Sequence, residues 1–330
     1  MKAAYIEQTG PPEVIRFGEL PDPAPGPEQV LVRVQAVSVN PVDTYIRGGA
    51  DYWELPRPFI IGCDLAGVVE SVGSQVTRFA PGDRVWGTNQ GLVGRQGTFA
   101  ELAAVDECWL YRLPDAVSFE AAAASALVGV TAHLGLFREA RLQSGETLFV
   151  HGGSGGVGSM VVQMAKIAGA HVITTAGSEQ KAAICRELGA DVVIDYRRAD
   201  VMQAIREAAP QGVDVFWETL REPDFDFIVE AMAERGRIVL MAGRDARPPF
   251  PVGPFYVKEC SLHGFVMFKA SPEEMRACAE AINDWMAAGR LQARIDRIMP
   301  LAEAAEAHRL QEASTVGHSG QLAGKIVLKP

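Results

Sequence analysis

The segment His151-Gly-Gly-Ser-Gly-Gly-Val-Gly158 decides the fold of this 330-residue chain. The residues that lead into it, Thr147–His151, have the length and composition of a buried strand. Apolar residues then recur at helical spacing until Gly169 ends the pattern. Read from Gly153, the segment has the spacing Gly-x-Gly-x-x-Gly between a strand and a helix, the context in which this motif binds the pyrophosphate of a dinucleotide. A glycine-rich turn without a ligand is the alternative, and the regular pattern that follows argues against it.

Five further apolar segments of strand length follow at intervals of roughly 20–25 residues and alternate with helical patterns. Such alternation produces a parallel sheet that helices cover on both faces. The segments are His171–Thr175, Asp191–Asp195, Val213–Trp217, Arg237–Met241 and Ser261–Met267. We therefore predict an α/β fold with a doubly wound parallel sheet, in which loops at the carboxyl ends of the strands line the ligand cleft.

The residues on either side of this region have a different pattern. The first 120 residues are rich in Gly and Pro, and Gln29–Val39 alternates apolar and polar residues as a strand does. Beyond residue 267, Ser271-Pro-Glu-Glu274 is a capping box that opens a helix, and Lys325–Lys329 has the composition of a last strand. The sequence thus favours one domain built from the head and the tail, with the α/β region inserted between them.

Composition limits the possible partners and the compartment. The chain has 41 acidic and 31 basic residues and a net charge of −10, so it lacks the basic surface of a general nucleic-acid binder. Its five cysteines form no Cys-x-x-Cys pair, which indicates a reducing compartment. The N-terminus lacks the apolar run of a signal peptide, and the longest apolar stretches are of strand length. We expect a cytoplasmic protein with no nucleic-acid or membrane partner.

The end of the second α/β strand indicates which dinucleotide binds. NAD sites place Asp or Glu there to accept the ribose 2′-hydroxyl, whereas this strand ends in Thr174-Thr-Ala-Gly-Ser178. Ser178, Lys181 and Tyr196 would bring a hydroxyl, an ammonium and a phenol to a 2′-phosphate, which favours NADP(H). Glu179 is a contrary observation, and a solvated helix lysine is the alternative interpretation of Lys181.

Several motifs occur together in one order: Asn40-Pro-Val-Asp-Thr-Tyr-Ile-Arg47, Gly62-Cys-Asp-Leu-Ala-Gly67, Gly82-Asp-Arg-Val85 and Ser154-Gly-Gly-Val-Gly158. In these the chain resembles the quinone oxidoreductases, the ζ-crystallin-like and zinc-free branch of the medium-chain dehydrogenase/reductase superfamily. The resemblance implies a GroES-like catalytic domain from residues 1–125 and 268–330, a Rossmann NADP-binding domain from residues 126–267, and a homodimer.

The zinc ligands of the alcohol-oxidising relatives have no counterpart here. Those relatives place a cysteine where this chain has Asn40, a His-Glu pair at Cys63-Asp64, and a second cysteine within Ala121–Ala124. Catalytic zinc needs three protein ligands, so we expect no metal. Without a Lewis acid, hydride transfer from NADPH to a quinone is favoured over alcohol oxidation. An NADPH-dependent enal or enone reductase is the first alternative, and a non-catalytic NADPH-binding protein, such as a structural crystallin or an RNA-binding regulator, is the second.

The resemblance also assigns site residues. Asn40 and Tyr45 are candidate catalytic groups that would donate hydrogen bonds to the acceptor carbonyl. An N-cap role explains Asn40 equally well, and a half-buried helix aromatic explains Tyr45. The expected cofactor-binding residues are Thr131, Gly153, Ser154, Gly155, Gly156, Val157, Gly158, Gly177, Ser178, Lys181, Tyr196, Gly243, Arg244, Phe265, Val266 and Lys325. Plain core packing is the alternative for Phe265, and Lys325 is included as the nearest basic residue at the C-terminal end of the chain.

Overall fold

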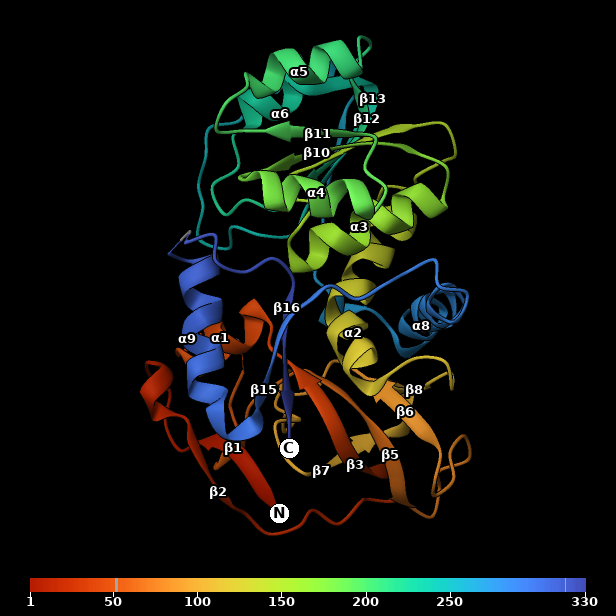
Figure 1. Ribbon diagram of the computed structural model, residues 1–330, viewed down its shortest axis with the longest axis vertical. Coiled ribbons are helices and arrows are strands. Elements are labelled where there is room, and N and C mark those ends of the chain that lie inside the picture. Colours follow the sequence, from red (N-terminus) through yellow and green to blue (C-terminus); the bar gives the residue numbers. More distant parts are fainter. Residues whose placement is uncertain (51–52, 318) are drawn as a thin grey trace. The chain divides into compact units, whose positions relative to one another are not determined.

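The computed structural model describes residues 1–50, 53–317 and 319–330. The chain divides into two compact units (Figure 1). The outer unit comprises Met1–Val130 and Ala270–Pro330, and the inserted unit comprises Thr131–Lys269. The sequence places these borders after residues 125 and 267, so each lies a few residues earlier than the border between the compact units.

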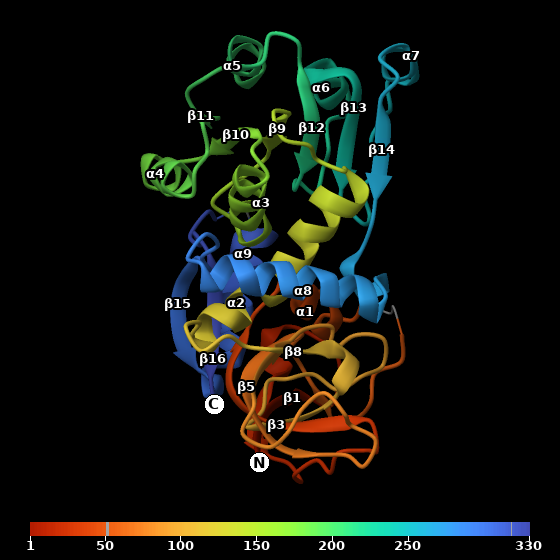
Figure 2. The same cartoon turned by 90° about the vertical axis from the view of Figure 1, so that its right-hand side faces the viewer.

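The inserted unit is built on a six-stranded parallel sheet with the order β11-β10-β9-β12-β13-β14. The first strand, β9, lies in the middle, and the strand order reverses between β9 and β12. Figure 2 shows β14 at one edge of this sheet. The strand bounds are β9 Thr147–Val150, β10 His171–Ala176, β11 Val192–Asp195, β12 Val213–Glu218, β13 Met232–Leu240 and β14 Ser261–Gly264. The predicted doubly wound sheet is confirmed.

Four of these strands agree with the sequence prediction to within one residue, and two differ by more. β13 begins before Arg237, and β14 ends at Gly264, so Phe265 and Val266 lie in the loop beyond the sixth strand. The helices of this unit are α3 Gly156–Ile167, α4 Glu179–Glu187, α5 Val201–Ala208, α6 Phe225–Ala231 and α7 Val252–Val257. Phe149 and Phe216, from the two central strands, are fully buried in the cluster that also takes in Ile205 and Ile228 from the covering helices.

The outer unit contains a seven-stranded sheet in which the last strand of the chain joins the first part to the second. β16 pairs antiparallel with β3 and parallel with β15, so the sheet is completed only by the C-terminus. The strands of this sheet are β3 Gln29–Ser38, β5 Asp64–Val72, β6 Arg84–Gly87, β7 Leu102–Asp106, β8 Leu110–Arg112, β15 Ile295–Pro300 and β16 Lys325–Lys329. A three-stranded sheet combines β1 Lys2–Ile6, β2 Arg16–Glu19 and β4 Phe59–Ile60.

The helices of the outer unit include α8, which begins at the predicted capping box, where the Ser271 hydroxyl accepts from the Glu274 N–H at 3.2 Å. The α-helices are α1 Pro41–Arg47, α2 Phe119–His133, α8 Pro272–Ala287 and α9 Ala304–Thr315, of which α2 runs across the border between the units. Short 3₁₀ segments cover Pro12–Val14, Glu107–Trp109, Met267–Lys269 and Leu301–Glu303, and a π-helical turn covers Leu134–Glu139.

The helical run Phe119–Glu139 corrects one expectation from the sequence. By length and composition alone it is long and apolar enough to cross a membrane, so the longest apolar stretch exceeds strand length. In the structure 72% of its apolar window is buried inside the protein, as in the core helix of a globular protein.

Candidate active site

The glycine turn follows the central strand β9 and is tied to the neighbouring strand β10. The N–H groups of Gly152 and Gly153 donate to the hydroxyls of Thr175 and Thr174 at 3.1 and 2.9 Å. A Cβ on Gly153 would lie 2.5 Å from the Thr174 hydroxyl oxygen, so a side chain there would break this contact. Helix α3 begins directly after Gly155, and its first N–H groups have no partner within the helix. These groups and the positive end of the helix dipole form a site for a phosphate.

The last glycine of the motif permits a close approach of backbone to backbone. A Cβ on Gly158 would lie 2.3 Å from the carbonyl oxygen of Gly152, which belongs to the turn itself. A backbone atom cannot rotate away as a side chain can, so glycine is required where helix α3 crosses the turn. The structure thus brings together the predicted turn residues Gly153, Ser154, Gly155, Gly156, Val157 and Gly158, at the edge of the sheet where the strand order reverses.

A second group of predicted residues lies at the carboxyl ends of β10 and β11. The phenol of Tyr196 lies against Gly177, where a Cβ would be 2.3 Å from the Tyr196 hydroxyl, and 52% of Tyr196 is exposed. Ser178 is the N-cap of α4, and its hydroxyl accepts from the backbone N–H of Lys181 at 3.3 Å. Ser178 and Tyr196 therefore follow the carboxyl ends of adjacent strands, and Lys181 lies in the first turn of α4.

The charges at this edge include residues that sequence reasoning missed. Tyr196 is followed directly by Arg197 and Arg198, both exposed. The carboxylate of Asp195 accepts from the Arg197 N–H at 3.0 Å and lies 3.5 Å from Arg198 Nε. Glu179, the contrary residue, pairs with Arg186 at 2.8 Å. Each of these two acids thus has a basic partner. Arg197 and Arg198 could have been predicted as site residues from the sequence, because they directly follow the third strand.

The remaining predicted cofactor residues of the inserted unit lie in loops beyond strand ends and in α2. Gly243 has φ +79°, and a Cβ there would lie 2.4 Å from the carbonyl oxygen of Arg221. Arg244 is exposed and pairs with Asp245 at 3.3 Å. Phe265 packs edge-to-face on Trp217 with ring centroids 6.3 Å apart. Val266 is half-buried beside it in sequence, and Thr131 is buried within α2.

A buried His–Glu pair next to the glycine turn was also missed. His151 Nδ1 lies 3.0 Å from both carboxylate oxygens of Glu218, which is fully buried at the end of β12. The Thr219 hydroxyl donates to the His151 carbonyl at 2.9 Å, so the ends of β9 and β12 are joined twice. A buried carboxylate needs such a partner, and the pair holds the two strand ends that border the reversal of strand order. The available signal was a His and a Glu at the carboxyl ends of two strands.

The outer unit contains a buried polar cluster around Asp64. This fully buried carboxylate accepts hydrogen bonds from Ser38 Oγ at 2.8 Å, Asn40 Nδ2 at 2.7 Å and Thr88 Oγ1 at 2.7 Å. The backbone N–H of Leu127 adds a fourth at 3.1 Å. Burial raises the pKa of Asp64, while the nearby Lys325 and these donors act to lower it.

Lys325 occupies the interior of this cluster, which contradicts its expected contact with a cofactor phosphate. Its Nζ donates to the Val39 carbonyl at 2.7 Å and to Asn40 Oδ1, and only 4% of the residue is exposed. Burial lowers the pKa of Lys325, and the neighbouring carboxylates Asp64 and Asp43 act to raise it. The ammonium is therefore the counter-charge of two buried acids and is not directed at solvent.

Asn40 belongs to the same cluster. It is fully buried at the N-cap position of α1, with Nδ2 bonded to Asp64 and Oδ1 to Lys325. Its amide is thus engaged within the outer unit, which favours the alternative that Asn40 serves as an N-cap over donation to a substrate carbonyl. Tyr45, the other catalytic candidate, is half-buried on the same helix.

The donor set of this cluster does not fit catalytic zinc. Cys63 Sγ donates to Asp43 Oδ1 at 2.8 Å, and Asp43 Oδ2 accepts the Asn40 N–H at 2.7 Å. Burial raises the pKa of Asp43 to about 7 and raises the pKa of the Cys63 thiol well above its usual range. Only one thiol is present, and the ammonium of Lys325 already supplies the positive charge. Within residues 1–50, 53–317 and 319–330, no three His, Cys, Asp or Glu side chains are grouped so that they could hold a metal ion.

Comparisons with known proteins agree with this architecture. Residues 26–115 match the family described as "Alcohol dehydrogenase GroES-like domain", and residues 156–284 match "Zinc-binding dehydrogenase". The chain is 34% identical to the quinone oxidoreductase of Lama guanicoe over 99% of its length and 97% of that protein. It is 34% identical to the quinone oxidoreductase of Pseudomonas aeruginosa over 93% of each chain. A 2-methylene-furan-3-one reductase of Solanum lycopersicum is 32% identical over 92% of this chain and 72% of its own.

Solved structures of dehydrogenases and of an NADPH-binding relative are also similar to this chain. An NAD-dependent alcohol dehydrogenase is 31% identical, with a TM-score of 0.89 over the whole of both chains. The mycobacterial protein Rv1454c, solved in complex with NADPH, is 31% identical, with a TM-score of 0.87 over the whole of both chains. These matches define a medium-chain dehydrogenase/reductase with a GroES-like domain and a nicotinamide-dinucleotide domain. The chain belongs to the quinone oxidoreductase family of these enzymes.

Proposed function

We propose that this protein is a zinc-independent oxidoreductase that transfers hydride from NADPH to quinones. The observation that carries the proposal is the glycine turn at the strand reversal of a doubly wound sheet, in a chain related over nearly its full length to quinone oxidoreductases. When bound, the nicotinamide supplies the hydride, and the protein supplies the binding site and the alignment of cofactor and acceptor.

The proposed cofactor site uses the backbone of Gly153–Gly158 and the start of α3 for the pyrophosphate. Ser178, Lys181 and Tyr196 would hold the 2′-phosphate, and the exposed Arg197 and Arg198 add positive charge beyond the same strand end. No acid stands at the tip of β10 to accept a ribose 2′-hydroxyl, which supports NADPH over NADH. We further propose that Thr131, Gly243, Arg244, Phe265 and Val266 contact the rest of the cofactor.

The acceptor side of the proposal rests on chemistry that needs no metal. A quinone is already electrophilic, and its conjugated oxygen takes the charge that arrives with the hydride. Tyr45 is the proposed hydrogen-bond donor to that oxygen, because the amide of Asn40 is engaged with Asp64 and Lys325. Asn40 then acts on the site by holding the first turn of α1, the helix that carries Tyr45.

The same proposal includes a cytoplasmic homodimer. β14 is the edge strand of the parallel sheet and exposes 40% of Leu262, and the adjacent α7 exposes 67% of Tyr256 and 70% of Val257. An edge strand with apolar neighbours is suited to pairing with a second copy. Sedimentation analysis at micromolar concentration tests this, and a monomer there would contradict it.

The activity is tested with purified, metal-free protein and a panel of acceptors. NADPH or NADH is mixed with ortho- and para-quinones, enals and enones, and the nicotinamide absorbance is followed. Turnover of quinones with NADPH is expected, whereas turnover of enals or enones alone would transfer the assignment to the alternative that the tomato relative represents. Tight NADPH binding with no turnover of any acceptor would favour a non-catalytic NADPH-binding protein.

The cofactor preference is tested by Lys181→Ala. Loss of an ammonium that meets a 2′-phosphate weakens NADPH binding much more than NADH binding, because NADH lacks that group. Arg235→Ala is the control, since Arg235 is an exposed arginine in the amino-terminal half of β13 and pairs with Glu259 at 2.7 Å, away from the carboxyl ends of β10 and β11. Equal losses for the two cofactors in Lys181→Ala would show that Lys181 does not contact the phosphate.

A further inference from the structure

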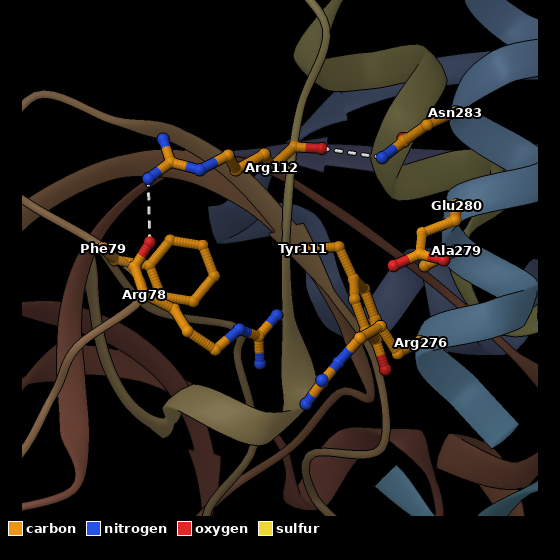
Figure 3. Close-up of a pocket in the computed structure, with 8 residues that line it drawn as sticks. All are labelled: Arg78, Phe79, Tyr111, Arg112, Arg276, Ala279, Glu280 and Asn283. Atoms are coloured by element: carbon orange, nitrogen blue, oxygen red, sulfur yellow. Dashed lines mark hydrogen bonds between the residues drawn. The ribbon is translucent and has the colours of Figure 1, made fainter. Parts of the chain in front are cut away.

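A pocket of about 370 Å³ lies within the outer unit, between helix α8 and the segments around β8 (Figure 3). Three arginines line it, Arg78, Arg112 and Arg276, together with the rings of Phe79 and Tyr111. None of these residues takes part in the proposed hydride transfer. The volume is in the range of small-molecule sites, and three guanidinium groups are an unusual lining for a pocket with no assigned role.

The three arginines differ in how their charges are compensated. Arg112 pairs with Asp83 at 2.9 Å. Arg78 donates to two backbone carbonyls, those of Glu107 and Leu110, each at 3.1 Å, and these carry no formal charge. Arg276 has no hydrogen bond or ion pair with any residue in the described part of the chain, although its Nε is buried. Two of the guanidinium groups therefore form no salt bridge within those residues, although the Glu107 carboxylate acts on Arg78, and Arg276 acts on Glu273, at longer range.

The two guanidinium groups without a salt bridge lie close together. In Figure 3 the guanidinium groups of Arg78 and Arg276 point toward one another. Burial lowers the pKa of Arg78, and the positive charge of Arg276 lowers it further. Like charges that converge in a partly buried pocket repel, and an anion between them would remove the repulsion.

A neutral donor lies beside the two cations. Tyr111 is only 3% exposed, and its hydroxyl is buried with no hydrogen-bond partner in the parts of the chain that the structure describes. Its ring packs against Trp86 with centroids 5.0 Å apart, so it is held in place. Burial raises the pKa of Tyr111, so the phenol keeps its proton and remains a donor. A buried unmet donor beside two unpaired guanidinium groups is consistent with an acceptor that enters the pocket.

We propose that this pocket binds a phosphate group, either as inorganic phosphate or as the end of a small organic phosphate ester. Arg78, Arg276 and Tyr111 approach from different elements and offer donors from several directions. A phosphate group carries up to two negative charges, which matches two converging guanidinium groups, and its terminal oxygens can accept from all three donors, whereas a carboxylate carries one charge. The Phe79 ring lies beneath the guanidinium groups of Arg78 and Arg112, at 5.1 and 5.7 Å from its centroid, and helps to hold both side chains in place.

Glu280 provides an internal check of this proposal. It also lines the pocket, and its carboxylate has no cationic partner within residues 1–50, 53–317 and 319–330. A negative charge there opposes a bound phosphate. Glu280→Gln is therefore expected to tighten phosphate binding by about two- to fivefold. A tighter affinity cannot result from misfolding, so this variant separates a site from a general loss of structure.

The experiment is a calorimetric titration of the full chain with inorganic phosphate in phosphate-free buffer, with and without saturating NADPH. One equivalent of phosphate is expected to bind with saturating NADPH, which occupies the glycine-turn site, and that site can take additional phosphate when NADPH is absent. Phenyl phosphate and phenol are titrated in parallel. Tighter binding of phenyl phosphate identifies an ester as the ligand, equal binding identifies phosphate alone, and binding of phenol as tight as that of phenyl phosphate would overturn the proposal.

The variants decide where phosphate binds. Arg276→Gln is expected to weaken it by about tenfold or more, and Tyr111→Phe to weaken it less while preserving the ring. Arg290→Gln is the matched control, an exposed arginine just beyond α8 that does not line the pocket. Absence of saturable binding up to about 10 mM phosphate, loss of binding in the presence of NADPH, or equal effects of Arg276→Gln and Arg290→Gln would overturn the proposal.

Discussion

Lys325 distinguishes two roles by mutation: the counter-charge of buried acids, which the structure shows, and a contact with the cofactor phosphate, which the sequence suggested. In the structure its ammonium is buried, donates to Val39 and Asn40, and faces the buried carboxylates of Asp64 and Asp43. Lys325→Met keeps the length of the side chain and removes the charge. Removing one partner of a buried charged group costs about 3–5 kcal/mol, because the other partner is left uncompensated. For a unit of this size, each kcal/mol corresponds to about 2–4 °C in the unfolding midpoint, so a fall of roughly 6–20 °C is expected.

The assay is urea unfolding followed by tryptophan fluorescence, with a control on the same strand. Lys329 also lies on β16 and pairs with Glu120 at 2.7 Å, but half of its side chain is exposed. An exposed pair of this kind contributes about 0–1 kcal/mol, so Lys329→Met should change the free energy of unfolding little. Adding Asp64→Asn to Lys325→Met should cost less than the two single changes together, because the second change removes the charge that the first left unpaired.

The same variants test whether Lys325 is structural or contacts the 2′-phosphate of the cofactor. If Lys325 is structural, Lys325→Met leaves the ratio of kcat/KM for NADPH and NADH unchanged. If Lys325→Met lowers the free energy of unfolding by less than about 1 kcal/mol and selectively lowers kcat/KM for NADPH, the structural role is refuted. Lys325 would then contact the 2′-phosphate.

Three further predictions follow from single contacts. Gly158→Ala would place a Cβ 2.3 Å from the carbonyl oxygen of Gly152, so fluorescence titration should show NADPH binding weakened by about tenfold or more. Glu218→Ala leaves His151 without its hydrogen-bond partner and should lower the free energy of unfolding by about 1–3 kcal/mol, with a smaller loss for Glu218→Gln, measured in urea. Asp43 titrates at about 7 when folded, against a model-peptide value of 3.8, so the folded state holds this proton longer than the unfolded state. Its contribution is therefore present below pH 3.8 and is lost as pH rises toward 7, by about 4 kcal/mol at most, and Asp43→Asn should flatten that part of the urea-midpoint profile.

The inserted unit could be predicted from sequence because its signals are local. Each buried strand is a short apolar run. The bounds of helix α3 are predicted by the glycines at its start and by Gly169, which follows the helix with φ +85°. The errors lie at the ends of strands. Phe265 continues an apolar run, so the pattern extends β14 past Gly264, whereas packing on Trp217 accounts for this residue without a strand.

The polar cluster of the outer unit could not be predicted in the same way. Lys325 and Asn40 are 285 positions apart, and only the pairing of β16 with β3 brings them together. A lysine in a strand pattern indicates a solvated side chain as readily as a buried one, since lysine is rarely buried unless it is paired. The available signal was Asp64 itself, a single acid in a segment otherwise apolar enough for a core.

The cluster also constrains the chemistry that the outer unit can perform. Lys325 uses its donors on Val39 and Asn40, so its charge compensates buried acids and cannot polarise a substrate oxygen as a Lewis acid does. An acceptor that needs its carbonyl activated would find no such group in this cluster. A quinone needs no strong activation, because its conjugated oxygen already accepts the charge, and alignment with one hydrogen-bond donor suffices. The buried ammonium is therefore compatible with the proposed quinone acceptor, and α1 with Tyr45 is the part of the outer unit where acceptor preference should be altered first.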